Sequence, residues 1–347
     1  SFLWCPGDGT PFLSVKKLLP GEAIIVKEGK ITEKWNWYQL PLFKKVSPIK
    51  NKKDSISNTL IYLRQAVHRQ MISDVPLGAF LSGGLDSSAI VALAKEKKSD
   101  IQCFTIETIG SQDKGIIDDL PYARKVAKHL NVSLDVVTVD HNNIAQDLQY
   151  MVTQLDEPLA DPAALNVFYI CQLAKKQGIK VLLSGVGGDD LFTGYRRHYA
   201  ISLQKYLNLI PLKARKILEE QTKIWPKNSS FQRKISKFFN GSSLSSSERL
   251  VNYFRWTNDS LLKSLYTKDF TNNLSSGLAE DPMLDFISPI TSSHSKLDQM
   301  LLLEQRFFLP DHNLNYTDKM SMASGVEVRV PFLDLDLVNF SAMLPNK

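Results

Sequence analysis

A short apolar run that ends in two glycines constrains this chain more than any other feature. Residues 75–81 (VPLGAFL) suit a short buried strand, and Gly83-Gly84 lets the backbone turn sharply with no Cβ in the way. Residues 87–95 are apolar and rich in helix formers, so a helix is expected to begin near Asp86. A helix that begins in such a turn presents unpaired N–H groups and a partial positive charge, which favour a bound phosphate.

The residue types in this turn indicate which kind of phosphate site it forms. The chain has neither the Gly-x-x-x-x-Gly-Lys-Ser/Thr loop nor the Gly-x-Gly-x-x-Gly dinucleotide motif, and residues 82–88 read Ser-Gly-Gly-Leu-Asp-Ser-Ser. A carboxylate among phosphate-binding hydroxyls is repulsive unless a cation lies between them, so Asp86 is predicted to bind Mg²⁺. The simpler alternative is a strand-to-helix turn in which Asp86 or Ser87 is an ordinary N-cap.

Strand and helix patterns alternate on both sides of this turn. Strands are expected at 101–106, 134–139 and 179–183, and helices at 56–71, from Asp119, at 145–155 and at 163–177 with Gly178 as the stop. This alternation predicts an α/β fold with a doubly wound parallel sheet, which binds ligands at the carboxyl ends of its strands. Residues 201–298 are weakly periodic and fit a peripheral helical insertion.

A second glycine-rich turn follows directly after the predicted strand at 179–183. Residues 184–197 read SGVGGDDLFTGYRR, and the paired carboxylates Asp189 and Asp190 would lie at the same edge of the sheet as the first turn. A glycine-rich turn that only caps a helix is the alternative. That alternative is less favoured because two turns that combine glycines with acidic residues each follow a predicted buried strand.

At these two turns the chain resembles the PP-loop ATP-pyrophosphatases, and closely the synthetase domain of glutamine-dependent asparagine synthetases. That family carries Leu-Ser-Gly-x-Gly-Gly-Asp-Glu-Leu-Phe-Gly-Gly-Tyr at the second turn. The resemblance implies ATP and Mg²⁺ as ligands, with Asp189 as a second magnesium carboxylate beside Asp86 and with Tyr195 near the acyl site. It also implies these ATP-binding residues: Leu81, Ser82, Gly83, Gly84, Asp86, Ser87, Ser88, Ile106, Ser184 and Gly185.

Three residues of the second turn depart from the family pattern. Val186 replaces an acidic residue, Asp190 replaces Glu, and Thr193 replaces Gly. The family's acid at the first position is linked to formation of the acyl-adenylate, and valine cannot accept a proton. Either the reaction of aspartate is altered here, or the role of the missing acid passes to Asp190.

A third motif lies near the end of the chain. Residues 309–334 resemble the family's Val-Asp-Arg-x-Ser-Met-Ala followed by Glu-x-Arg-x-Pro-Phe-Leu-Asp. The resemblance places Asp318 and Lys319 at the acid–base pair that faces the acyl substrate. Their residue types alone fit a helix-surface pair, with Met320 and Val326 as core residues. The family continues beyond this point and supplies a catalytic lysine there.

The first residues differ in character from the rest. Residues 1–42 read as short strands and turns, with Glu28-Gly29-Lys30 as a tight hairpin. They resemble the closing hairpin of the N-terminal glutaminase domain of asparagine synthetases, whose nucleophilic cysteine would lie upstream and is not Cys5. Residues 1–45 are therefore interpreted as the end of that domain and 46–347 as the synthetase domain, and the chain is expected to be truncated at both ends.

Composition excludes several classes of protein. With 347 residues and 43% hydrophobic content the chain can bury a large core, and it holds no apolar run long enough to span a membrane. The three cysteines, Cys5, Cys103 and Cys171, are odd in number and widely spaced, which favours a reducing cytoplasm. Much of the net charge of +6 lies between Lys205 and Lys237, where no stacking-aromatic or base-reading pattern accompanies it, so a solvated helical face is favoured over a nucleic-acid site. The six histidines, including His312, look incidental.

The resemblance implies an ATP-dependent, amide-forming ligase. A substrate carboxylate, first of all the side chain of aspartate, would attack the α-phosphate of ATP to give an acyl-AMP and pyrophosphate. Ammonia derived from glutamine would then give asparagine and AMP. A homodimer is one option for the assembly of such an enzyme. Val186 motivates a first alternative with a sugar acid of a surface polysaccharide as the carboxylate, and a non-catalytic ATP-binding scaffold is a second. The 347-residue chain itself is expected to be inactive with glutamine.

Overall fold

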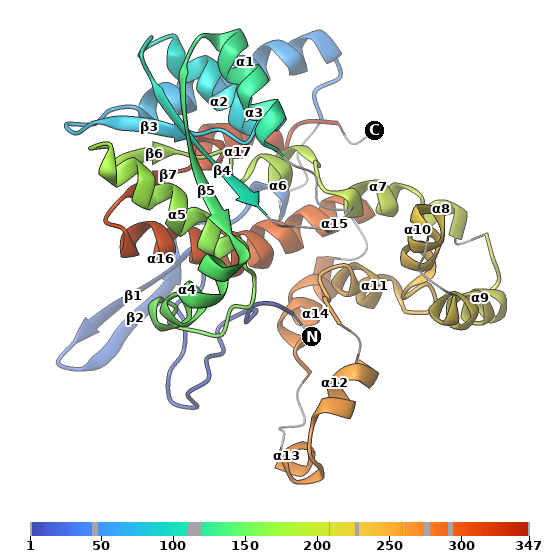
Figure 1. Cartoon of the computed structure of the whole chain (residues 1–347). Helices are drawn as coiled ribbons and strands as arrows, with labels where there is room; N and C mark the ends of the chain where they lie inside the picture. The colour runs from blue at the N-terminus through green and yellow to red at the C-terminus, as the bar shows by residue number, and fades with distance from the viewer. Residues whose placement is uncertain are drawn as a thin grey trace.

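A parallel β-sheet lies at the centre of the computed structural model, which describes residues 2–43, 48–109, 119–207, 209–225, 229–257, 259–273, 278–290 and 294–345. The sheet has five strands in the order β5-β4-β3-β6-β7, and every neighbouring pair is parallel (Figure 1). The α/β prediction is therefore confirmed. The strands are β3 (Leu77–Phe80), β4 (Gln102–Ile109), β5 (Ser133–Asp140), β6 (Val181–Leu183) and β7 (Glu327–Arg329).

The strand order makes the sheet doubly wound. From β3 the chain adds β4 and β5 on one side and then returns to add β6 and β7 on the other. The direction of winding therefore reverses between β3 and β6, and such a switch point is where open α/β sheets bind ligands. Both glycine-rich turns follow these two strands directly.

Helices cover both faces of the sheet (Figure 1). On one face Ala79, Cys103 and Leu183 pack with α1, α2, α3 and α17, while alternate strand residues such as Phe104 and Leu182 pack with α5 on the other. α4 and α16 pack against α5 on this second face. The helices of these two layers are α1 (Lys52–Gln70), α2 (Leu85–Lys95), α3 (Leu120–Leu130), α4 (His141–Gln154), α5 (Ala163–Lys176), α16 (Asn315–Ala323) and α17 (Leu335–Ser341).

Most expected elements agree with the structure to within a few residues. α5 runs from Ala163 to Lys176, and Gly178 after it has φ +79°, as its role as a helix stop requires. α1 begins at Lys52 rather than Ile56, because the Asn51 side chain accepts a hydrogen bond from Lys53 N at 2.9 Å and caps the helix early. β7 was not expected. It has three residues, too few to show a pattern of alternation.

Residues 2–43 form an extension that packs on the main body. β1 (Glu22–Lys27) and β2 (Lys30–Asn36) form the expected antiparallel hairpin, with Glu28 and Gly29 at positive φ in its turn. A short 3₁₀ turn, η1 (Pro41–Phe43), follows. The expected domain boundary between residues 45 and 46 lies outside the described residues.

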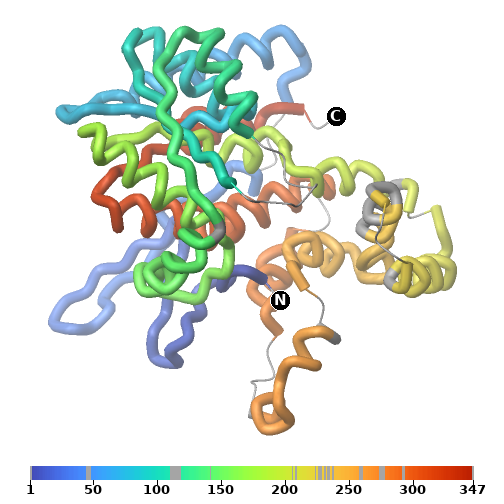
Figure 2. Tube along the Cα trace, in the orientation of Figure 1, coloured from blue at the N-terminus to red at the C-terminus, as the bar shows by residue number. Residues whose placement is uncertain are grey.

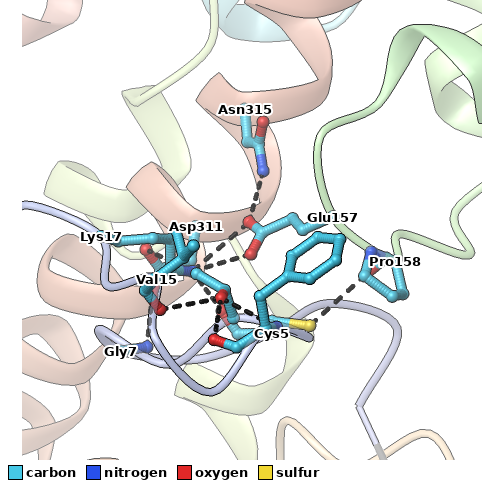
Figure 3. A network of polar contacts seen from close by, with 10 residues as sticks. Cys5, Gly7, Val15, Lys17, Glu157, Pro158, Asp311 and Asn315 are labelled. Carbon is cyan, nitrogen blue, oxygen red and sulfur yellow. Dashed lines mark hydrogen bonds and ion pairs between the residues drawn. The ribbon is translucent and has the colours of Figure 1, made fainter.

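A polar network holds the start of this extension on the body (Figure 3). Lys17 Nζ lies 3.0 Å from Glu157 Oε2 and donates to the carbonyl of Cys5 at 2.8 Å. The Asp311 carboxylate lies 3.8 Å from the same ammonium and accepts from Gly7 N at 2.9 Å. Burial of the Asp311 carboxyl raises its pKa to about 6, although Gly7 N and Lys17 lower it. The extension is therefore anchored by charged groups beside its apolar anchor, the buried Trp4.

Residues 201–298 form a helical insertion on one side of the sheet, as expected for the part that the structure describes (Figure 2). Its base packs Leu250, Met283 and Met300 against Trp4. In the basic stretch, Arg215 donates to the Ser242 carbonyl at 3.1 Å, whereas Lys227 lies outside the described residues. The helices of this region are α7 (Arg196–Ser202), α8 (Gln204–Leu207), α9 (Leu212–Ile224), α10 (Ser230–Phe239), α11 (Ser246–Asn252), α12 (Asp259–Leu265), α13 (Lys268–Asn273), α14 (Asp281–Ile287), the 3₁₀ turn η2 (Ser288–Ile290) and α15 (Lys296–Leu303).

A π-helix, η3 (Glu304–Leu314), continues α15 and leads directly into α16. It contains Pro310, which has no N–H to give to an α-helical ladder, and wide π turns of this kind are frequent at functional sites. A short 3₁₀ turn, η4 (Pro331–Leu333), precedes α17. In the part of the chain that the structure describes, no helix is long and apolar enough to cross a membrane.

Candidate active site

A cavity of about 770 Å³ opens at the carboxyl ends of β3 and β6. Two turns form one side of it, and the end of η3 with the start of α16 forms the other. We call the first side the glycine-turn wall; its residues are Ser82, Gly84, Leu85, Asp86, Ser87, Ser184, Gly185, Val186, Gly187, Gly188 and Asp189. We call the second side the helical wall; its residues are Phe308, His312, Asn313, Tyr316 and Thr317. Asp161, Tyr195 and four further residues complete the lining.

The first glycine turn has an internal hydrogen-bond pattern that leaves the helix start open. Ser82 N donates to Ser87 Oγ at 3.2 Å, and Gly84 N donates to Ser82 Oγ at 3.3 Å. Gly84 is the N-cap of α2 and no side chain caps this helix, so neither Asp86 nor Ser87 acts as the N-cap. The N–H groups of the first turn of α2 therefore remain available to an anion in the cavity.

Glycine is required at the points where the two turns meet. A Cβ on Gly188 would lie 2.4 Å from the carboxyl carbon of Asp86, and one on Gly185 would lie 2.8 Å from Ser87 N. Gly83, at φ +79°, would place a Cβ 2.4 Å from Ala123 N. The backbone of the second turn therefore lies directly against the first, and the Asp86 carboxyl rests on it.

The two carboxylates of this wall are destabilised as anions. Burial raises the pKa of Asp86 to about 6, and the negative charge of Asp189 adds to the increase. Burial also raises the pKa of Asp189. Two neighbouring carboxylates whose pKa values are both raised by burial fit a shared cation, because a divalent ion would stabilise their charged forms. Among the described residues no group of three or more His, Cys, Asp or Glu side chains could hold a metal ion.

Several residues implied by the resemblance lie away from the cavity surface. Leu81 is buried and its N–H pairs with Phe104 O at 2.9 Å, and Ile106 packs in the core beside Phe168. Gly83 and Ser88 belong to the first turn but do not line the cavity. Lys319 forms an ion pair with Asp156, and Asp318 lines a separate depression with Lys17 and Glu157. The structure thus brings together the two turns but does not bring Asp318 and Lys319 to them.

Asp190 lies behind the cavity in a fully buried polar cluster. Its Oδ2 accepts from Tyr195 Oη at 3.2 Å, and its Oδ1 has no hydrogen-bond partner. Glu304 is also fully buried, lies 2.6 Å from His198 Nε2 and forms an ion pair with Arg197. Burial, followed by the charge of Glu304, raises the pKa of Asp190 to about 7. Burial likewise raises the pKa of Tyr195, which donates to Asp190 and itself lines the cavity.

The helical wall was not expected from the sequence. His312 was interpreted as incidental, yet it lines the cavity, with its ring stacked on Phe308 at 4.8 Å and edge-on to Tyr316 at 5.3 Å. Asp161 and Asn313 were not singled out either. The motif at 309–334 was the available signal, because it contains a histidine and an asparagine beside the residues that the resemblance emphasised.

Fold and site together define an α/β domain of the PP-loop type, in which two glycine-rich turns and two carboxylates face one cavity. The family model for asparagine synthase matches residues 60–347, more than half of the chain. The chain therefore belongs to the asparagine synthase family.

Several known proteins are similar to this chain. The chain is 30% identical over 348 residues to asparagine synthetase [glutamine-hydrolyzing] 1 of Bacillus subtilis, covering 100% of this chain and 52% of that protein. It is 24% identical over 364 residues to the amidase chyE of Penicillium rubens, covering 99% of this chain and 54% of that protein. A solved NH3-dependent NAD synthetase from Campylobacter jejuni aligns with 13% identity and a TM-score of 0.28, covering 56% of this chain and 97% of that one. The chain spans about half the length of the curated relatives it matches.

Proposed function

We propose that this chain is the synthetase part of an ATP-dependent, amide-forming ligase that adenylates a substrate carboxylate and transfers ammonia to it. The observation that carries the proposal is the glycine-turn wall, where the uncapped start of α2 lies beside Asp86 and Asp189 in one cavity. Family membership and the relative named as a glutamine-hydrolysing asparagine synthetase support it. Residues 1–45 would be the end of a glutaminase domain and residues 46–347 the synthetase domain.

In the first half-reaction the chain's own groups would hold the pyrophosphate of ATP. The N–H groups at the start of α2 and the hydroxyls of Ser82 and Ser87, residues that line the cavity, would contact the leaving group. Ser184 and Gly185 would contact the nucleotide from the second turn. Magnesium held by Asp86, Asp189 and the phosphates would supply charge neutralisation on the α-phosphoryl group and the pyrophosphate. Together these groups favour attack of the carboxylate on the α-phosphorus.

The acyl substrate would lie between Val186 and the helical wall. Tyr195 faces this space and Asp190 supports it from behind, through the hydrogen bond at 3.2 Å. Because Asp190 is not among the cavity-lining residues and contacts Tyr195, which is, it would act on the substrate indirectly. Asp318 and Lys319 would face the acyl group only if Lys319 left its ion pair with Asp156.

The test is carboxylate-dependent release of AMP and pyrophosphate by the full-length protein that contains this chain. With ATP, Mg²⁺, aspartate and ammonium chloride we expect equal amounts of AMP, pyrophosphate and asparagine. Glucuronate and galacturonate serve as the comparison, because Val186 in the cavity lining also motivates a sugar acid as the substrate. Efficient formation of asparagine would exclude the sugar-acid alternative, and uronamide formation would exclude aspartate.

One variant distinguishes a non-catalytic, ATP-binding scaffold from the two enzyme hypotheses, with aspartate or a sugar acid as the substrate. Asp86→Ala removes a carboxylate of the glycine-turn wall, and circular dichroism checks that the variant is folded. Any AMP release by the wild-type protein that this variant abolishes refutes the scaffold. Absence of AMP release with every carboxylate, together with nucleotide binding, would instead support it.

A further inference from the structure

A histidine and a carboxylate face each other in the cavity, on the side away from the two glycine turns. His312 Nε2 lies 3.1 Å from Asp161 Oδ2, and both residues line the cavity. The His312 side chain is only 4% exposed, and its Nε2 makes no aligned hydrogen bond. The other carboxylate oxygen of Asp161 accepts from Ala163 N at 2.8 Å, which fixes the orientation of the carboxylate at the start of α5.

A directed chain of hydrogen bonds assigns the proton on the His312 ring. Tyr195 Oη donates to Asp190 Oδ2 at 3.2 Å, and Asn313 Nδ2 donates to Tyr195 Oη at 3.3 Å. Asn313 Oδ1 is then the acceptor that faces His312 Nδ1 at 2.9 Å. With Nδ1 carrying the proton, Nε2 is the nitrogen with a lone pair, and it points to the space beside Asp161.

The environment of the pair favours an anionic Asp161. The hydrogen bond that Ala163 N donates to Asp161 Oδ1 at 2.8 Å stabilises the charged form of this carboxyl. In this tautomer neither His312 Nε2 nor Asp161 Oδ2, which lie 3.1 Å apart, carries a proton. This arrangement is complementary to an N–H group that donates to both atoms.

We propose that Asp161 and His312 form the ammonia-binding and proton-accepting pair of the amide-forming half-reaction. The inference rests on the proposed function. Ammonia donates hydrogen bonds to the two acceptors and attacks the acyl carbon of the acyl-AMP, forming the C–N bond. The positively charged nitrogen gives one proton to His312 Nε2, and the bond between the acyl carbon and the AMP oxygen breaks with its electron pair on AMP. His312 then carries the proton, Asp161 stabilises the imidazolium, and the amide is released.

The pair also fits the substitution at residue 186. Valine in the glycine-turn wall offers no acceptor for an N–H group, and Asp190 is not among the cavity-lining residues but contacts Tyr195, which is. Asp86 and Asp189 belong to the phosphate side. Among the described residues that line the cavity, Asp161 is therefore the carboxylate that lies outside the proposed phosphate site.

The test separates the two half-reactions in the full-length protein. Adenylation is measured as aspartate-dependent exchange of labelled pyrophosphate into ATP, and amide formation as asparagine made from ammonium chloride. We expect His312→Gln to keep exchange within about threefold of wild type and to lower amide formation by about 100-fold or more, the usual contribution of a positioned base. Asp161→Asn keeps an oxygen for Ala163 N and should lower amide formation by about 10-fold and raise the KM for ammonium. His129→Gln, at an exposed position of α3, is the matched control.

The outcomes distinguish this inference from the proposed function. If exchange and amide formation fall together in His312→Gln, or if neither falls, the proposed role of the pair is wrong. Neither result refutes adenylation by the wild-type protein. Absence of exchange in the wild-type protein would refute the proposed function with aspartate. A second measurement is independent of the carboxylate: ¹⁵N spectra of the histidine rings should show His312 protonated at Nδ1, with the Nε2 signal shifting on addition of ammonium chloride. An Nε2-protonated ring, or no response to ammonium, would refute the pair.

Discussion

The two sides of the cavity are built in different ways. The glycine-turn wall consists of two short loops at the ends of β3 and β6, where glycine and carboxylate residues follow a buried strand in the sequence. The helical wall consists of side chains on the π-helix η3 and on α16, which belong to no strand of the sheet. The first wall is encoded by local residue types, whereas the second depends on where a helix packs. The two walls should therefore respond differently to substitution.

The largest expected effect is on the glycine-turn wall. Asp86→Asn removes one of the two negative charges but keeps the size of the side chain against Gly188. We expect carboxylate-dependent AMP release to fall by about 100-fold or more, because a cation at this site would contribute several kcal/mol to the reaction. Steady-state assays at saturating ATP on the full-length protein measure it, with the exposed Asp74→Asn as the control. Retention of more than a tenth of the activity would contradict the role of Asp86.

The contrast also explains what the sequence could predict. The first turn and the strand before it were found because strand, glycine turn and helix follow within residues 75–95, and Gly83 does adopt the φ of +79° that the turn requires. The α/β sheet was found because its strands and helices alternate. His312 was missed because one histidine on a helix carries no periodic signal, and its neighbour Asp161 lies far away in the sequence. Lys319 was placed by resemblance, but its ion pair with Asp156 depends on how α16 packs.

The next largest effect is expected behind the helical wall and concerns stability. Glu304 is fully buried with Arg197 and His198, so Glu304→Gln leaves the Arg197 guanidinium without its counter-ion. We expect the free energy of unfolding to fall by about 3–5 kcal/mol. Urea denaturation followed by circular dichroism measures it. Glu327→Gln is the matched control, because the exposed Glu327 pairs with Arg329 at 2.8 Å and should change stability by less than about 1 kcal/mol. Equal losses in the two variants would contradict a buried cluster.

A smaller effect, dependent on pH, is expected at Asp190. The folded protein holds the pKa of this carboxyl at about 7, above its ordinary value, so between these values the folded state binds more protons than the unfolded state. Stability should therefore fall as pH rises through this window, and Asp190→Asn should remove that loss. We expect the variant to gain about 1–3 kcal/mol relative to wild type between pH 4 and pH 8. Urea midpoints at several pH values measure it, with the exposed Asp100→Asn as the control. A constant difference across the range would contradict the raised pKa.

The smallest effect is expected at Lys319, and it tests where the helical wall ends. Lys319 pairs with the largely exposed Asp156, outside the cavity lining, so Lys319→Ala should cost no more than about 1 kcal/mol of stability. AMP release should change by less than about threefold, since Lys319 is not among the residues that line the cavity, whereas Tyr316 and Thr317 are. Asp156→Asn should match it in both measurements. If AMP release falls tenfold or more in Lys319→Ala but not in Asp156→Asn, this lysine acts at the acyl group, as the family resemblance implies. The helical wall would then also include Lys319 of α16.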